Sequence, residues 1–279
     1  MHPACWVSRR AKTNFSLNGT RLKESELATK YAIAGRVRQH AWRVPYPEDP
    51  PLRMTGAVIL AAGGSSRFGE PKQLISFRGK RLVRRIVDAA RRAGCSPIVA
   101  VVGSDSETIR HALKRTKAVI VDNGKWKRGI GSSIRIGVEV LIKEGQSPLT
   151  RRSAPKTADH PVRAKKADSV SRRRLENRRS LEAVVLLACD QPFVDANTIR
   201  NLIELRKKTK QGIVASSYAN TLGVPALFSR SFFQELLSLG DEAGAKSIIL
   251  RNRKRVVEFP FPEGAIDVDT WDDWEKVKE

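Results

Sequence analysis

Short, uninterrupted apolar runs are the feature of this sequence that most constrains its fold. They occur at residues 57–61, 98–102 and 183–188. Runs of five or six such residues without polar alternation are typical of strands that are covered on both faces, as in a parallel sheet. Between the first two runs, residues 82–93 place their apolar side chains on one helical face and end at Gly94. Alternation of strands and helices predicts an α/β fold class.

The same alternation continues along the rest of the chain. We expect further strands at residues 118–121, 212–215, 225–228 and 256–259, and further helices at 106–114, 132–143, 196–208, 231–239 and 245–250. Thr270 and Asp273 have the spacing of a capping box that opens a last helix. The pattern predicts a single Rossmann-like three-layer α/β/α domain with a mostly parallel sheet. Ligands of such sheets bind beyond the carboxyl ends of the strands, which directs attention to residues 63–72, 122–131 and 190–192.

The positive charge of the chain is unevenly distributed. The 279 residues carry a formal net charge of +23, of which residues 1–55 hold +6 and residues 146–180 hold +8. Neither segment shows an apolar pattern that could offset its ordering entropy. We therefore expect a poorly ordered basic extension at 1–54 and a domain at 55–279. A disordered basic insertion at about 146–180 would interrupt that domain.

Met54 directly precedes the first strong strand pattern. It is therefore a candidate start of translation, which would make residues 1–53 dispensable. A proline-rich stretch at residues 45–51 reads as a linker ahead of the domain.

Several function classes are excluded by what the sequence lacks. It has no run of about 18 apolar residues and no secretory signal, so we expect a cytoplasmic protein without a membrane partner. Cys5, Cys95 and Cys189 lie far apart, which argues against a disulfide scaffold or a cysteine zinc site. No aromatic residue interleaves with the basic residues of the insertion, so we expect a solvated loop there and no base-stacking nucleic-acid partner. The alternative is a weak electrostatic contact of this segment with nucleic acid or an acidic partner.

A glycine-rich segment follows the first strand and carries two cations. Gly63, Gly64, Ser65 and Ser66 allow backbone N–H groups to converge on an anion, and Arg67 and Lys72 follow them. Backbone N–H groups together with two cationic side chains are suited to binding a polyphosphate. The segment is neither a Walker A loop nor a GxGxxG turn. The alternative interpretation is a plain glycine turn with surface cations.

Six segments in order resemble those of the MobA-like nucleotidyltransferases, and most closely those of the molybdenum cofactor cytidylyltransferases. They read LAAGGSSRFGEPK from Leu60, NGKWKRGIGSSIRIG from Asn123, DQP from Asp190, GVP from Gly223, GDEAGAK from Gly240 and DVDT from Asp267. Lys246 replaces the arginine of the family pattern, and Trp271-Asp272-Asp273 replaces its Pro-Glu-Asp. The resemblance covers residues 56–279 without the insertion and explains neither basic segment.

The resemblance implies a fold and an activity. The fold is the GT-A-like domain of the nucleotide-diphospho-sugar transferases. The activity is a Mg²⁺-dependent transfer of CMP from CTP to the phosphate of the molybdenum cofactor, with release of pyrophosphate. CTP and the molybdenum cofactor are then the substrates, and a client molybdoenzyme is an implied partner. Three alternatives stay open: a GTP-using relative, a different phosphorylated acceptor, and a chaperone that hands over the cofactor.

The resemblance also implies roles for particular residues. Arg67, Lys72 and Asp190 are the expected catalytic residues, because cations and a metal-bound carboxylate stabilise the charge that grows on the departing pyrophosphate. Asp190 and Asp269 are the expected Mg²⁺ ligands. Asp267 could replace Asp269, and either could instead cap the last helix.

The expected nucleotide-binding residues are Leu60, Ala61, Ala62, Gly63, Gly64, Ser65, Ser66, Arg67, Lys72, Asn123, Ser132, Ser133 and Asp190. Ala62 stands where guanylyltransferase relatives usually carry glycine, which favours CTP. Ser132 and Ser133 could equally be helix caps, and Asn123 a turn residue. Trp126 could lie in the core or stack on a substrate. The segments at 223–225 and 240–246 are expected on the acceptor side, with Asp241 paired to Lys246.

Overall fold

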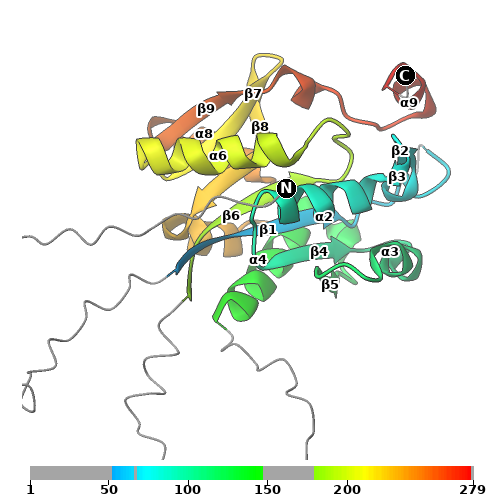
Figure 1. Ribbon diagram of the computed structural model, residues 1–279, viewed down its shortest axis with the longest axis horizontal. Helices are drawn as coiled ribbons and strands as arrows, with labels where there is room; N and C mark the ends of the chain where they lie inside the picture. The colour runs from blue at the N-terminus through cyan, green and yellow to red at the C-terminus, as the bar shows by residue number, and fades with distance from the viewer. Residues whose placement is uncertain (1–51, 66–67, 147–178, 278–279) are drawn as a thin grey trace, which may run out of the picture. The chain divides into compact units, whose positions relative to one another are not determined.

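In the computed structural model, which describes residues 52–65, 68–146 and 179–277, a seven-stranded sheet forms the centre (Figure 1). Its order is β5-β4-β1-β6-β8-β7-β9. The strands are β1 (Leu52–Ala61), β4 (Ile98–Val102), β5 (Val119–Asp122), β6 (Arg179–Ala188), β7 (Ile213–Tyr218), β8 (Thr221–Ser229) and β9 (Val256–Pro260). β8 is antiparallel to its neighbours β6 and β7, and the other pairings are parallel. The predicted mostly parallel sheet is confirmed.

Helices cover both faces of this sheet. They are α2 (Leu82–Arg92), α3 (Ser106–Leu113), α4 (Ile130–Gln146), α6 (Ala196–Thr209), α7 (Phe233–Leu237), α8 (Ala245–Arg251) and α9 (Trp271–Val277). Buried side chains of α2, α3, α6 and α9 form one core layer, and those of α4, α7 and α8 form another. The three-layer α/β/α arrangement is therefore confirmed. No helix in the described part of the chain is long and apolar enough to cross a membrane.

β1 and β6 are longer than the sequence predicts. Leu52 pairs with Arg179 and Met54 pairs with Leu181, so the strands reach into the expected extension at 1–54 and the expected insertion at 146–180. The polar residues at these strand beginnings interrupt the apolar pattern, which is why periodicity missed them. A start of translation at Met54 would remove Leu52 and Arg53 from β1. The remainder of both expected segments, residues 1–51 and 147–178, lies outside the described residues.

Two local features follow the first strand and precede the last helix. A short hairpin of β2 (Ser76–Phe77) and β3 (Lys80–Arg81) was not predicted, because two-residue strands carry no periodicity. The predicted capping box is confirmed: the Asp273 N–H donates to Thr270 Oγ1 at 3.2 Å, and the Thr270 N–H donates to Asp273 Oδ2 at 3.0 Å. Thr270 therefore caps α9, and neither Asp267 nor Asp269 is needed for that purpose.

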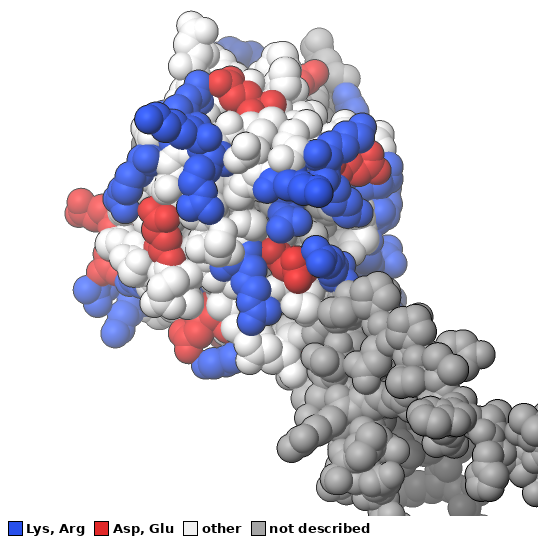
Figure 2. Space-filling view, turned by 90° about the vertical axis from the view of Figure 1, so that its left-hand side faces the viewer, with Lys and Arg blue, Asp and Glu red and all other residues white. Residues whose placement is uncertain are grey.

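Exposed lysine and arginine side chains lie at the sheet edge where β7 and β9 begin. Exposed Lys207, Lys208 and Lys210 lie at the end of α6, and exposed Arg251 and Lys254 precede β9. Figure 2 shows Lys and Arg side chains spread over the corresponding side of the molecule, with Asp and Glu between them. Because β7 and β9 run away from this edge, their carboxyl ends point to the opposite one. The candidate site lies at that opposite edge.

Gly137 lets α4 approach the sheet closely. A Cβ at this position would lie 2.5 Å from Val58 Cγ1 on β1 and 2.9 Å from Val101 Cγ2 on β4. Both valines are fully buried. The helix can therefore pack at this distance only without a side chain at position 137.

Gly137→Ala should lower the free energy of unfolding by about 1–2 kcal/mol, because overpacking outweighs the gain in helix propensity. Urea denaturation measures this change. In a Val58→Ala background the cost should be smaller, since the closest methyl group is gone. An unchanged or raised stability for Gly137→Ala would contradict the close packing of α4 on β1.

Candidate active site

Parallel pairing of β1 with β6 brings two candidate segments to one edge of the sheet. Leu60 is in register with Ala188, so the glycine-rich segment after β1 and Asp190 after β6 begin side by side. β4 and β5 also end at this edge, since Ala61 pairs with Val102 and Val102 with Asp122. The three segments selected from the sequence, 63–72, 122–131 and 190–192, therefore meet at the carboxyl edge.

Lys72 joins two carboxylates that are distant in sequence. Its Nζ lies 2.8 Å from Asp190 Oδ2 and 2.7 Å from Asp269 Oδ1. Burial by itself would lower the pKa of Lys72, but attraction and hydrogen bonding from Asp190, together with those from Asp269, outweigh it and raise the pKa. Lys72 is thus held as an ammonium ion between the two acids.

The two acids that contact Lys72 also fit a divalent cation. Both carboxylates contact the Lys72 ammonium group, so both could also contact a single metal ion in its place. Mg²⁺ is commonly held by one or two carboxylates together with substrate phosphates. The described residues contain no group of three or more His, Cys, Asp or Glu side chains arranged for a metal. Any metal here would therefore need oxygen ligands from a substrate or from water in addition to the two carboxylates.

A third carboxylate adds negative charge to the same place. Desolvation and the charges of Asp190 and Asp269 raise the pKa of Asp267 to about 6. Lys72 contacts Asp269 and has no contact of this kind with Asp267. One ammonium thus contacts two of three neighbouring acids, and the uncompensated negative charge favours an additional cation.

Gln73, which sequence reasoning missed, fixes the glycine-rich segment. This side chain is 1% exposed, and its Nε2 donates to Ala61 O at 3.2 Å and Gly63 O at 2.8 Å. Ser65 Oγ contacts Gln73 Oε1 at 3.4 Å and accepts the Lys72 N–H at 3.0 Å. Gln73 follows the glycine-rich turn and bonds to backbone at its beginning, so it holds the two ends of the turn together. The available signal was a polar residue beside Leu74 and Ile75, directly after Pro71-Lys72.

A cavity of about 210 Å³ lies beside this turn. Its wall is formed by Leu60, Ala62, Gly63, Lys72, Gln73, Trp126, Ile130, Ser133, Ala188, Cys189 and Asp190. The structure thus brings together residues from all three candidate segments. Ser66 and Arg67, both predicted to bind nucleotide, lie outside the described residues.

Trp126 packs over the turn as one wall of the cavity. A Cβ on Gly64 would lie 2.5 Å from its ring, and a Cβ on Gly103 would lie 2.8 Å from Trp126 Cγ and 2.5 Å from Ala62 O. Trp126 is half-buried. The indole therefore packs on the protein and also lines the cavity, and stacking on a substrate stays a prediction.

Asn123 lies behind the cavity and positions two serines. It is fully buried, and its Nδ2 contacts Ser132 Oγ at 2.8 Å and Ser133 Oγ at 3.0 Å. Its Oδ1 accepts the Lys125 N–H at 3.0 Å, which makes it a turn residue as well. Ser132 Oγ donates to Gly129 O at 2.7 Å, whereas Ser133 lines the cavity. Of this group, Ser133 is the side chain placed to meet a ligand.

The 240–246 segment supports the start of α4. The Gly131 N–H donates to Asp241 O at 2.8 Å, and a Cβ on Gly129 or Gly131 would collide with this backbone. Asp241 pairs with Arg128 and Arg135, so the expected pair with Lys246 is wrong. The hydrogen bond from Arg135, with the charges of both arginines, lowers the pKa of Asp241. Both arginines lie within the motif that begins at Asn123, but the sequence did not identify them as partners.

Cys189 is a buried thiol, as its apolar sequence context predicts. It is 5% exposed, and burial together with the charge of Asp190 raises its pKa above the ordinary range. A thiol held in its neutral form is a poor nucleophile. Cys189 therefore serves as a small apolar part of the cavity wall.

The carboxyl edge of this open α/β sheet thus brings together a clamped glycine turn, a lysine and two carboxylates, at the place where ligands of such sheets bind. Residues 57–256 match the family model of the MobA-like NTP transferase domain. The chain belongs to this family.

Solved structures agree with this assignment. The chain is similar to Rv0371c of Mycobacterium tuberculosis H37Rv, with 28% identity, a TM-score of 0.57, and coverage of 81% of this chain and 97% of that one. A manganese complex of Rv0371c gives 27% identity and a TM-score of 0.55, over 81% and 98% of the two chains. Molybdopterin-guanine dinucleotide biosynthesis protein A of Archaeoglobus fulgidus shares the fold, with 15% identity, a TM-score of 0.51, and 81% and 97% coverage.

Curated relatives match shorter stretches. Nicotine blue oxidoreductase of Paenarthrobacter nicotinovorans is 33% identical over 90 residues, which cover 32% of this chain and 44% of that protein. The bifunctional enzyme IspD/IspF of Novosphingobium aromaticivorans is 35% identical over 101 residues, or 35% and 25% of the two chains. The matches thus span less than half the length of these relatives.

Gln73→Met should weaken nucleotide binding about 10-fold, because it removes the amide that donates to Ala61 O and Gly63 O, leaves Gly63 O with the longer bond from Ser104 Oγ at 3.3 Å, and loosens the turn. The same loss should cost about 1–3 kcal/mol of stability. Isothermal titration with CTP and urea denaturation measure the two effects. Gln234→Met, at an exposed position on α7, is the matched control and should change neither. Wild-type affinity in Gln73→Met would show that the turn does not depend on this clamp.

Proposed function

We propose that this protein is a divalent-metal-dependent cytidylyltransferase that transfers CMP from CTP to the phosphate of the molybdenum cofactor. An oxygen of the acceptor phosphate forms a bond to the α-phosphorus of CTP. The bond from that phosphorus to the bridging oxygen of the β-phosphate breaks, and pyrophosphate leaves. The observation that carries the proposal is the contact of Lys72 with both Asp190 and Asp269 beside the glycine turn.

The triphosphate would bind along the turn from Gly63 to Lys72. Backbone N–H groups of the turn, Arg67 and Lys72 are the proposed partners of its oxygens. Asp190 and Asp269 would hold Mg²⁺ or a similar ion, which would neutralise phosphate charge and orient the tail. Lys72 would then stabilise the negative charge that grows on the phosphates during transfer. Lys72 is already ionised, and in the proposed reaction it would leave Asp190 and Asp269 to the metal and turn to the phosphates.

The size of the cavity supports a pyrimidine base. Its volume of about 210 Å³ is below the roughly 300–1,000 Å³ that is common for ligand sites. Ala62 is 6% exposed and its methyl group takes space where glycine would leave room. Ser133 offers a hydroxyl that can meet the edge of a base. The Ala62 methyl group narrows this wall relative to a glycine, and this is what supports CTP over GTP in the proposal.

The purified protein should release pyrophosphate from CTP only when the molybdenum cofactor is present. A coupled pyrophosphate assay with CTP, GTP and ATP, each with and without the cofactor, measures this. Release with GTP alone among the three would replace the cytidylyl assignment by a guanylyl one. If no pyrophosphate is released with any of the three nucleotides, the proposal is overturned.

Asp269→Asn should weaken Mn²⁺ binding to the CTP complex by roughly 10-fold or more, because one of two carboxylate ligands is lost. Electron paramagnetic resonance of free Mn²⁺ measures this without catalysis. Asp272→Asn, three residues away at an exposed position of α9, is the matched control and should bind Mn²⁺ as the wild type does. Equal affinity in both variants would remove Asp269 from the metal site.

A further inference from the structure

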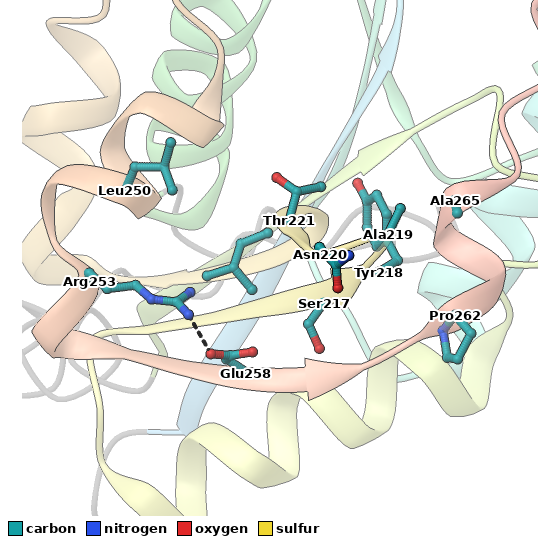
Figure 3. A pocket seen from close by; sticks show the side chains of 11 residues that line it. Ser217, Tyr218, Ala219, Asn220, Thr221, Leu250, Arg253, Glu258, Pro262 and Ala265 are labelled. Atoms are coloured by element: carbon teal, nitrogen blue, oxygen red, sulfur yellow. Dashed lines mark hydrogen bonds and ion pairs between the residues drawn. The ribbon is translucent and has the colours of Figure 1, made fainter.

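A second, larger cavity lies beyond β8, along β7 and β9, and reaches the carboxyl edge of the sheet at the β7–β8 hairpin. It measures about 780 Å³ and lies among the β7–β8 hairpin, β9, the end of α8 and a short helical turn at Pro262–Ala265. Figure 3 shows the side chains of Ser217, Thr221 and Leu250 around it. We propose that this cavity holds the body of the phosphorylated acceptor, a polar ring system without net charge. This inference rests on the proposed function and adds to it the place and chemistry of acceptor recognition.

The cavity wall is connected directly to the turn that carries Asp190. Tyr218 lines the cavity, and its hydroxyl donates to Val224 O at 3.0 Å. Gln191 Nε2 contacts the same carbonyl at 3.1 Å and Gly264 O at 3.0 Å. Gln191 directly follows Asp190, so the Asp190–Gln191 turn separates the two cavities. An acceptor whose phosphate lies near Lys72 can thus place its body beyond this turn.

Both cavities border the same layer of the molecule. Ala62 lines the smaller cavity and Leu222 lines the larger one. Both residues belong to the core layer between the sheet and α4, α7 and α8. Cys189, which also lines the smaller cavity, belongs to the other core layer, so the smaller cavity lies at the sheet edge between the two layers.

The lining predicts a ligand that forms many hydrogen bonds but carries no net charge there. Asn220 offers an amide, and Ser217 and Thr221 offer hydroxyls. The charged residues of the wall, Arg253 and Glu258, pair with each other at 2.6 Å and cancel (Figure 3). No unpaired cation in this wall competes with Lys72 for the acceptor phosphate.

Apolar surface and size narrow the class further. Leu250, which is 54% exposed, and Pro262 lie at opposite ends of the cavity and give it apolar surface on either side of the polar hairpin residues (Figure 3). A volume of about 780 Å³ lies in the upper part of the common range for ligand sites. A flat heterocycle with amide-like edges, such as a pterin, matches these walls better than a small sugar phosphate does.

The test uses 6-hydroxymethylpterin, a ring body without phosphate, as a binding probe for the full-length protein. Saturation-transfer NMR and titration should show binding to the wild type, with shifts at the Leu250 methyl groups. Asn220→Gly removes the amide, and glycine suits its φ of 57°. Ser217→Phe fills the cavity. Both variants should weaken the probe at least 10-fold, and they should leave the Kd for CTP unchanged.

Lys210→Gly is the matched control, since Lys210 has a similar φ of 56° and lies outside the cavity. It should bind the probe as the wild type does. Wild-type probe affinity in both Asn220→Gly and Ser217→Phe, or no probe binding at all, would overturn the inference.

The result separates this inference from the proposed function. If cytidylyl transfer proceeds and its KM for the acceptor is unchanged in both cavity variants, the function stands and the inference fails. If no nucleotide is used but the probe still binds with the expected sensitivity to the two substitutions, the cavity assignment stands and the proposed transfer fails.

Discussion

The parallel pairing of β1 with β6 is the constraint on which the candidate site depends. It places the start of the glycine turn after Ala61 and the acid after Cys189 at neighbouring points of one edge. The two strands are buried on both faces, so a shift in their register would expose apolar side chains and separate the two segments. Stability and the geometry of the site are therefore set by the same contacts.

The charges at the carboxyl edge of the sheet then determine which ligands can bind there. Asp190, Asp267 and Asp269 gather negative charge there, and Lys72 compensates for part of it. The remaining charge favours a divalent ion, and that ion would favour a triphosphate. The two cavities on either side of the Asp190–Gln191 turn give such a reaction separate places for the nucleotide and the acceptor. The family assignment and the local chemistry thus support the same class of reaction.

Sequence patterns predicted the layers well because burial on both faces leaves continuous apolar runs, such as 98–102. They also identified the turn at Gly63 and the acid at Asp190, since both follow such runs directly. Patterns could not show that Lys72 contacts Asp269, 197 positions away, or that Asp241 pairs with Arg128 and Arg135. Gln73 was missed because one polar residue in a short segment has no period. Such contacts depend on the folded backbone.

A crystal structure of the protein with a non-hydrolysable CTP analogue and Mn²⁺ tests the central claim most directly. Anomalous scattering locates the metal without relying on the nucleotide model. Our account predicts manganese bound by Asp190 and Asp269, with the triphosphate along the turn from Gly63 to Lys72 and the cytosine against Ala62 and Ser133. Manganese or triphosphate bound elsewhere, with Lys72 still bridging the two carboxylates, would contradict it.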